Sequence, residues 1–434
     1  MKRRLPGVDH PMRSLFVLAV VGCSSGTVST PTSSSGSDLD LGGLGGKHAE
    51  PVPPPAPTPA PKLPTAVAPT GGGVDLIADA RELYRIAACG GDAPVDANRT
   101  KIVERHCKNL RARINQFRAA YFEQHRAWFD EVVPHDIPTT VVYPFGGGDL
   151  LSALVAFPDA TEITTISLEL AGDPRRLRTL QPNQLETSLA TLRVEIGGLI
   201  SVGSNTSVNL SAQQRNELPG QVSSFLIALV AGGYEPVAMR YFTLDDAGAI
   251  KYHEQAELDA IAPKRTRSLK GDWASPNFSE AFSHVEIQYR KIGDTKLRVH
   301  RHLGWNLGDD YLAKHPQLIR HLEAKGKVTM LTKGASYLLQ RPDFSTIRTY
   351  MLEHLAWMLS DSTGIAPTYA GPAGMVQETY GAYSGAFLGG ARGNKHDQSF
   401  VELWRKNPKN KLGFRFGYVD ASGSGHLVVT KPKT

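Results

Sequence analysis

The sequence predicts an α/β fold, in which a Rossmann-like mixed sheet with added antiparallel hairpins follows a helical N-terminal section. Three observations predict it. Runs with apolar residues every three to four positions come before any strand-like run. From residue 139, short β-rich runs alternate with helical ones, which is typical of parallel sheets. Later β-rich runs flank the turn sequences "DDAG" and "GDT", which indicate antiparallel hairpins.

The first residues read "MKRRLPGVDHPMRSLFVLAVVGCSSG" and predict an exported chain. A basic segment precedes the apolar run from Leu15 to Val21, which is too short to span a bilayer and is typical of a signal-peptide core. Gly22-Cys23 follow, so this end resembles the lipobox of bacterial lipoproteins, in which the Cys thiol is acylated. We expect a signal peptide at residues 1–23 and lipidation of Cys23. An ordinary signal peptide that ends in Cys is the alternative.

Acyl chains on Cys23 would tether a soluble protein to a membrane. Ser24 stands where Asp often retains lipoproteins at the inner membrane, which favours the outer membrane. The expected location is therefore the cell envelope, lipid-anchored at the outer membrane and facing the periplasm or the surface. The expected partners are the membrane, through the anchor, and an unknown envelope protein or small molecule. The formal charge of +6 includes four cations in the leader, so charge gives no support for a nucleic-acid partner.

Composition divides the rest of the chain into three parts. Residues 24–73 are Ser/Gly-rich and then Pro/Ala-rich, which predicts a disordered linker whose second half is a stiff spacer. Helical periodicity predicts a helical section at 74–138, and the α/β domain is expected at 139–434. In that domain we expect strands at 139–145 and 161–170, helices at 149–157 and 218–234, hairpins at 235–254 and 284–307, a helix at 315–326, a strand at 327–339, one long helix at 343–361 and a late strand at 411–419.

The three cysteines are Cys23, Cys89 and Cys107. Outside the cytoplasm the last two are expected to form a disulfide. A closed loop of about 18 residues would stabilise the fold by roughly 3 kcal/mol. Two buried free thiols are the alternative. His106 beside Cys107 suggests a metal site, but two cysteines and one histidine leave a tetrahedral site short of a ligand.

The segment "VVYPFGGGDLL" is the candidate ligand site. A strand, three glycines (Gly146, Gly147, Gly148) and a helix that starts after Asp149 open a Rossmann-like unit, and Glu169 follows the next strand. Glycines allow close approach of a ligand, and an acidic residue at this distance can hold ribose hydroxyls. Two features disagree with a dinucleotide: Leu151 replaces the third glycine, and Asp149 would repel a phosphate. The alternative is a strand-to-helix corner capped by Asp149.

No cofactor is expected, and two alternatives remain open. S-adenosylmethionine carries no phosphate, so the glycine corner would tolerate it better than a dinucleotide. Zinc is the other, because "RVHRHLGW" places His300 and His302 on one face of a predicted strand, where such a pair can chelate a metal ion. Two half-exposed strand histidines are the alternative to that metal site.

Two segments carry a resemblance to known proteins, namely "VVYPFGGGDLLSALVAFPDATEITTISLE" and "VTMLTKGASYLLQRPDFSTIRTYMLEHLAWMLSDSTGIAP". They resemble an uncharacterised group of exported bacterial proteins and lipoproteins that is similar in pattern to degenerate methyltransferase-like domains. The resemblance covers about residues 75 to 430. It implies a Rossmann-like core and no assigned activity.

Taken together, these features predict an outer-membrane lipoprotein that displays a non-catalytic α/β binding or structural domain. The alternative is an envelope enzyme, either derived from a methyltransferase or a metal-assisted hydrolase. An enzyme requires Glu169 and other acids around an open cleft at the glycines, or an acid within metal-binding reach of His300 and His302. A binding or structural domain does not require acidic side chains to gather at either place.

Overall fold

A computed structural model describes residues 72–92, 94–200, 220–260, 279–383, 385, 395–407, 410–414, 416 and 425–433. All of them belong to one unit, Pro64–Thr434. The expected signal peptide, Cys23 and nearly all of the expected linker lie outside the described residues. Among the helices that are described, none has the length and apolar content needed to cross a membrane.

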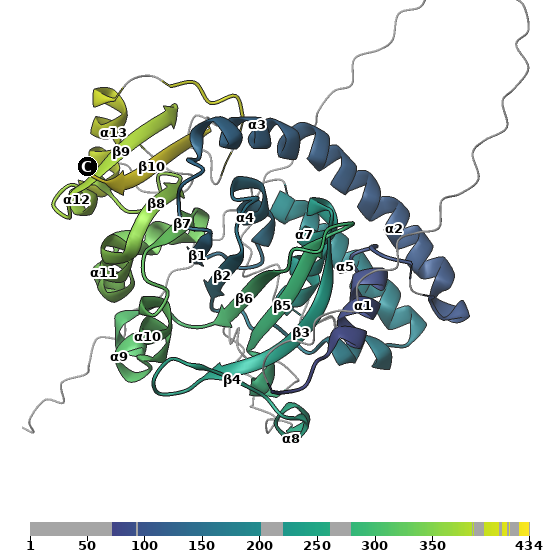
Figure 1. Cartoon of the computed structure of the whole chain (residues 1–434). Helices are drawn as coiled ribbons and strands as arrows, with labels where there is room; N and C mark the ends of the chain where they lie inside the picture. The colour runs from purple at the N-terminus through teal and green to yellow at the C-terminus, as the bar shows by residue number, and fades with distance from the viewer. Residues whose placement is uncertain are drawn as a thin grey trace, which may run out of the picture. The chain divides into compact units, whose positions relative to one another are not determined.

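The described strands form one mixed sheet in the order β4-β3-β5-β6-β2-β1-β7-β8-β10-β9 (Figure 1). The central strands β6, β2, β1, β7 and β8 are parallel to one another, and the strands outside them pair antiparallel. The prediction of a mixed α/β fold with added antiparallel strands is confirmed. The strands are β1 (Thr140–Pro144), β2 (Glu162–Ser167), β3 (Tyr234–Leu244), β4 (Ile250–Tyr252), β5 (His284–Lys291), β6 (Arg298–Gly304), β7 (Val328–Thr332), β8 (Leu355–Ser360), β9 (Met375–Gly381) and β10 (His426–Pro432).

The strand order reverses at β1. From there the chain builds outward through β2 and β6 on one side, and through β7 and β8 on the other. In open α/β sheets, ligands bind outside the carboxyl ends of the strands at such a reversal. The carboxyl ends of β1, β2 and β7 are therefore the place to look for a site.

Helices cover both faces of the sheet. Val141 and Tyr143 of β1 pack into a core with α1, α2, α4, α5 and α7, whereas Val142 packs into a second core with α9, α10 and α11. Successive strand residues point to opposite faces, so the two cores lie on the two sides of the sheet. The bounds are α1 (Ile77–Ile86), α2 (Ala97–Phe117), α3 (Glu123–Val132), α4 (Leu150–Ala156), α5 (Pro182–Ile200), α7 (Gly220–Gly232), α8 (Gln255–Asp259), α9 (Asp309–Lys314), α10 (Gln317–Glu323), α11 (Ser345–His354), α12 (Pro367–Ala370) and α13 (Lys395–Lys406).

In the helical N-terminal section, α2 and α3 form one long, curved helix along the rim of the molecule, and α1 is a separate short helix (Figure 1). A π-helical turn, η1 (Arg118–Phe122), joins α2 to α3 without a break. Asp96 caps the start of α2 by accepting from the amide of Asn98 at 2.8 Å. The apolar residues at helical spacing face inward, as their burial shows: Val103, Cys107, Leu110, Ile114 and Phe117.

Two predictions about later elements are wrong. The long helix expected at 343–361 ends at His354, and β8 begins at the next residue. The residues of β8 favour helices, but the segment lies between β7 and β10 and pairs with both strands. This pairing outweighs the local preference for a helix. The strand expected at 411–419 is absent from 411–414, and residues 415 and 417–419 lie outside the described part of the chain. The sheet ends instead in β10 and β9, which we did not predict.

Candidate functional site

The corner between β1 and α4 is tightly folded. Phe145 has φ +61° and Gly147 has φ +53°, so two backbone positions adopt the left-handed region, which a bulky residue such as Phe145 rarely enters. A Cβ atom on Gly146 would lie 2.9 Å from the carbonyl oxygen of Tyr143. On Gly148 it would lie 2.8 Å from the side-chain oxygen of Gln221. Close packing within the protein thus accounts for these two glycines.

Helix α7 closes one side of this corner. Gln221 and Ser224 in its first turns lie against Gly148, and the amide of Val222 donates to the carbonyl of Ala171, beyond the end of β2, at 3.1 Å. Gln221 is fully buried, and both polar atoms of its amide lack a hydrogen-bond partner among the described residues. The first turn of α7 therefore fills the space beside Gly148. On this side, the segment has the packing expected of a strand-to-helix corner without a ligand.

Asp149 lies at the centre of a compact polar cluster. It caps α4 by accepting from the amide of Ser152 at 3.2 Å, and it accepts from the hydroxyl of Tyr143 at 3.0 Å. Lys333, just beyond β7, lies 2.7 Å from the Asp149 carboxylate and donates to the Ser152 hydroxyl at 2.7 Å. The Lys333 and Asp149 side chains are only 15% and 10% exposed, so this is a buried ion pair.

Lys333 changes how Asp149 acts. Its ammonium group neutralises the carboxylate, so the corner carries no net negative charge from this pair. Lys333 was not predicted as the partner of Asp149. Lys333 falls inside the strand predicted at 327–339, whereas β7 ends at Thr332 and so places Lys333 at the edge of the sheet where the carboxyl ends of the parallel strands meet.

Glu169 does not join the cluster around Asp149. The strand β2 ends at Ser167, and the carbonyl of Glu169 lies 2.8 Å from Nε2 of His302, which donates to it. Across the described part of the chain, no hydrogen bond or ion pair links the Glu169 carboxylate to the glycines or to Asp149. The structure thus groups Gly146, Gly148 and Asp149 with α7 and Lys333 rather than with Glu169.

His300 and His302 lie side by side on β6, and both are fully buried. Their ring nitrogens lie 3.0 and 3.1 Å from the hydroxyl of Thr165 on β2. The ring of Phe225 on α7 lies 4.4 Å from the ring of His300. Burial lowers the pKa of His302 to about 4 and the pKa of His300 well below its usual range. The alternative of half-exposed histidines is wrong, since their environment is the core of the sheet.

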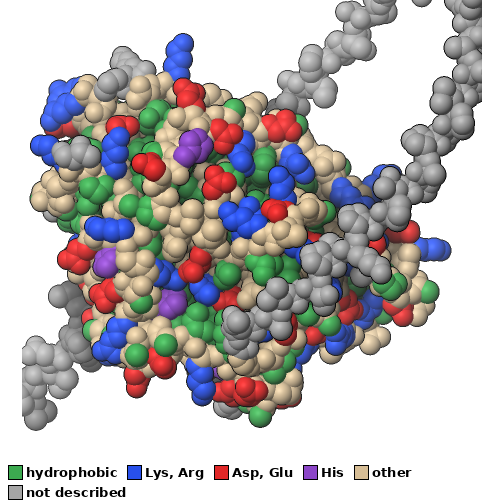
Figure 2. Space-filling model, viewed as in Figure 1, with side chains coloured by type: hydrophobic (Ala, Val, Ile, Leu, Met, Phe, Trp, Pro, Cys, Tyr) green, Lys and Arg blue, Asp and Glu red, His purple; other side chains and the backbone are tan. Residues whose placement is uncertain are grey.

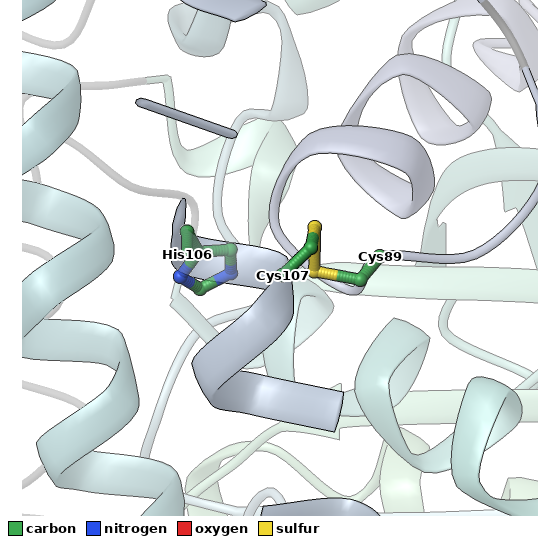
Figure 3. A group of neighbouring side chains, drawn as sticks. All are labelled: Cys89, His106 and Cys107. Atoms are coloured by element: carbon green, nitrogen blue, oxygen red, sulfur yellow. A yellow bond between two sulfur atoms is a disulfide. The ribbon is translucent and has the colours of Figure 1, made fainter. Parts of the chain in front are cut away.

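Cys89 and Cys107 form the predicted disulfide (Figure 3). Together with His106 they are the one group of three metal-ligand side chains found within the described ranges, so His300 and His302 gain no third ligand there. The bonded sulfurs cannot act as thiolate ligands. His106 is also occupied, because Nε2 donates to the carbonyl of Ala87 at 2.9 Å and Nδ1 accepts from Arg193 at 3.0 Å.

These buried histidines predict loss of stability in mild acid. Burial lowers the pKa values of His106, His302 and His321 to about 4, from 6.5 for an exposed histidine. Between pH 6.5 and 4 the unfolded chain therefore binds protons that the folded chain excludes, so stability falls as pH falls. Each group contributes about 1.4 kcal/mol per pH unit in the middle of this window.

Urea unfolding at several pH values between 7 and 4.5 measures this slope. Replacing His321 by Asn should reduce the slope of the unfolding free energy against pH by the amount that corresponds to about one proton bound on unfolding. The same substitution at the exposed His135 is the control and should leave the slope unchanged. Equal slopes for His321→Asn and the unmodified chain would contradict the lowered pKa of His321 in the folded protein.

A buried charge network was also missed, because its members are far apart in the sequence. Arg301 on β6 lies 2.8 Å from Glu162 on β2 and 2.8 Å from Glu286 on β5, and Lys325 pairs with Glu162. Burial raises the pKa of Glu162, but Lys325 and Arg301 outweigh that effect and hold it at about 2. Glu162 begins β2, so this network lies away from the carboxyl ends and joins the antiparallel strands to the core.

Comparisons with protein-family models, with curated proteins and with solved structures found no match. Function is therefore argued from the chain's own residues. In the polar cluster, Asp149 pairs with Lys333, caps α4 and accepts a hydrogen bond from the phenol hydroxyl of Tyr143. These groups therefore meet one another's hydrogen-bonding and charge requirements. That is an arrangement suited to fixing the corner rather than to transferring a group.

Proposed function

We propose that this chain is a lipoprotein, anchored to the outer membrane, that displays a non-catalytic α/β domain in the cell envelope. One observation carries the non-catalytic part: the first turn of α7 lies on Gly148. A cofactor in a Rossmann-like domain needs this space, where the glycine loop faces the end of the second strand. Protein atoms occupy it here, so the corner supports the fold instead of a ligand.

Two features support the envelope location. The disulfide between Cys89 and Cys107 is of a kind that persists in oxidising compartments such as the periplasm and is rare in the cytosol. The N-terminal sequence, with its short apolar run before Gly22-Cys23, resembles the lipobox of bacterial lipoproteins. These observations come from different parts of the chain and agree.

Substitution of Cys23 tests the anchor. In a bacterium that processes lipoproteins, we expect the unmodified chain in the outer-membrane fraction and Cys23→Ser outside it, because the acylated thiol is gone. Mass spectrometry of the N-terminal peptide should show acyl chains on Cys23. The control is Ser24→Ala, which keeps the thiol and should still fractionate with the membrane. Membrane retention of Cys23→Ser would contradict the proposal.

Gln221 tests whether the corner is packed protein or a ligand site. Both polar atoms of its buried amide lack a hydrogen-bond partner among the described residues, which costs stability, so Gln221→Met should raise the free energy of unfolding by about 1 kcal/mol. If a bound molecule used these atoms, the same change would instead lower stability. Urea unfolding measures the difference. Gln116→Met on the exposed face of α2 is the control for the residue change and should have little effect.

The alternative function is an enzyme derived from a methyltransferase. The strand order supports it, because the order reverses at β1, and open α/β sheets bind their ligands at such a reversal. Calorimetric titration with S-adenosylmethionine separates the two proposals. We expect no saturable heat, whereas binding that Gly148→Ala abolishes would favour the enzyme. A zinc-dependent hydrolase is less well supported, since His300 and His302 are buried without a third ligand among the described residues.

A further inference from the structure

The outward face of α2 carries a concentration of positive charge. Six exposed basic residues lie on this helix and the following turn, and the exposed acidic residue among them is Glu104. By contrast, Figure 2 shows basic and acidic side chains interspersed over much of the face in view. The basic residues are Lys101, Arg105, Lys108, Arg111, Arg113 and Arg118, here called the α2 basic face.

Most of this charge is not neutralised within the described structure. Arg105 pairs with Glu186 on α5. Arg111 donates to the carbonyl of Cys89 at 2.8 Å and Arg113 to the carbonyl of Arg193 at 2.9 Å, which orients both guanidinium groups but leaves their charge. Lys101 and Lys108 have no ion pair among the described residues.

The backbone that carries this charge is held rigidly. The disulfide ties α2 to the chain after α1, and the buried residues on its inner face pack against α5 and the sheet. The helix has 21 residues and is therefore roughly 30 Å long. Beyond the π-helical turn the charge changes sign, since α3 carries Glu123, Asp130 and Glu131 against one cation, Arg126. The positive charge is thus confined to the exposed side of one rigidly held helix.

We propose that the α2 basic face docks on an anionic membrane surface. This inference rests on the proposed anchoring through Cys23, which would keep a bilayer within reach of the domain. Each Lys or Arg close to an anionic bilayer contributes about a fivefold gain in partitioning, and the attraction extends over about one Debye length. An extended row of cations on a rigid helix can bring several of these charges to a flat surface at once. The domain then lies against the membrane rather than at the end of its tether.

Vesicle binding by the chain from Ser24 onward tests this proposal, because that chain keeps every described residue and lacks the acylated cysteine. We expect it to sediment with vesicles that contain phosphatidylglycerol and not with vesicles of phosphatidylcholine alone. The triple variant Lys101→Glu, Lys108→Glu, Arg118→Glu should lose at least about 100-fold in partitioning, because it removes three attractive charges and adds three repulsive ones. Salt at about 0.5 M should release the unmodified chain, since it shortens the Debye length.

A matched variant controls for net charge: Lys291→Glu, Lys314→Glu, Lys411→Glu changes three exposed cations outside α2. It should bind vesicles far better than the α2 variant, and circular dichroism should show that both fold. Equal loss in the two variants, equal binding to neutral vesicles, or binding to soluble polyphosphate without binding to vesicles would overturn the proposal. None of these outcomes bears on lipidation, which the Cys23→Ser experiment measures separately.

Discussion

Replacing Lys333 by Met should lower the free energy of unfolding by about 3 to 5 kcal/mol. The change leaves the Asp149 carboxylate buried without its partner, and removal of one member of a buried ion pair costs far more than the pair itself contributes. It also removes the hydrogen bond from Lys333 to Ser152. Urea unfolding followed by circular dichroism measures the loss.

Two further variants identify the cause. Asp149→Asn combined with Lys333→Met should recover most of the loss, because Asn still caps α4 and no charge remains buried. Arg341→Met is the control, since it breaks an ion pair with Asp343 in which the side chains are 50% and 51% exposed. This exposed pair should cost less than about 1 kcal/mol to break. A loss of that small size for Lys333→Met would show that the cluster does not hold the corner.

Loss of the disulfide should be the other large effect, about 3 kcal/mol. The bond closes a loop with a sequence separation of 18 residues, and it joins the chain just after α1 to the middle of α2. The double variant Cys89→Ala, Cys107→Ala frees that loop in the unfolded chain and removes two buried side chains. Urea unfolding with and without a reducing agent measures the effect.

The reducing agent supplies the control. It should destabilise the unmodified chain and leave the double variant unchanged, and Cys23→Ser in both backgrounds keeps the third cysteine from forming other bridges. If the double variant were as stable as the oxidised chain, the bond would contribute nothing to the fold. A reductant effect on the double variant would point to a different cause.

Much of the fold could be predicted from the sequence, because its signals are local. Alternating apolar residues, glycines after helices and the turn "DDAG" mark elements whose positions the structure reproduces closely. The error at β8 arose because Leu355 to Ser360 contain residues that favour helices, and only pairing with β7 and β10 makes them a strand. Such pairing depends on residues far away in the chain.

The candidate site was harder to predict for the same reason. The cap formed by Asp149 is local, and the sequence pattern indicated it. Its ion pair with Lys333 joins distant parts of the chain, and the packing of Gln221 on Gly148 depends on where α7 lies in space. No local pattern contains that information. The disulfide was predictable because Cys89 and Cys107 are the two cysteines that follow Cys23 in the sequence.

The direct junction of α11 and β8 constrains how this chain can change in length. His354 ends the helix and Leu355 begins the strand, so no loop residue lies between them. One inserted residue would shift β8 by one position against β7 and turn its buried side chains to the opposite face. Length variation among descendants of this sequence should therefore avoid positions 354 and 355 and accumulate in surface connections.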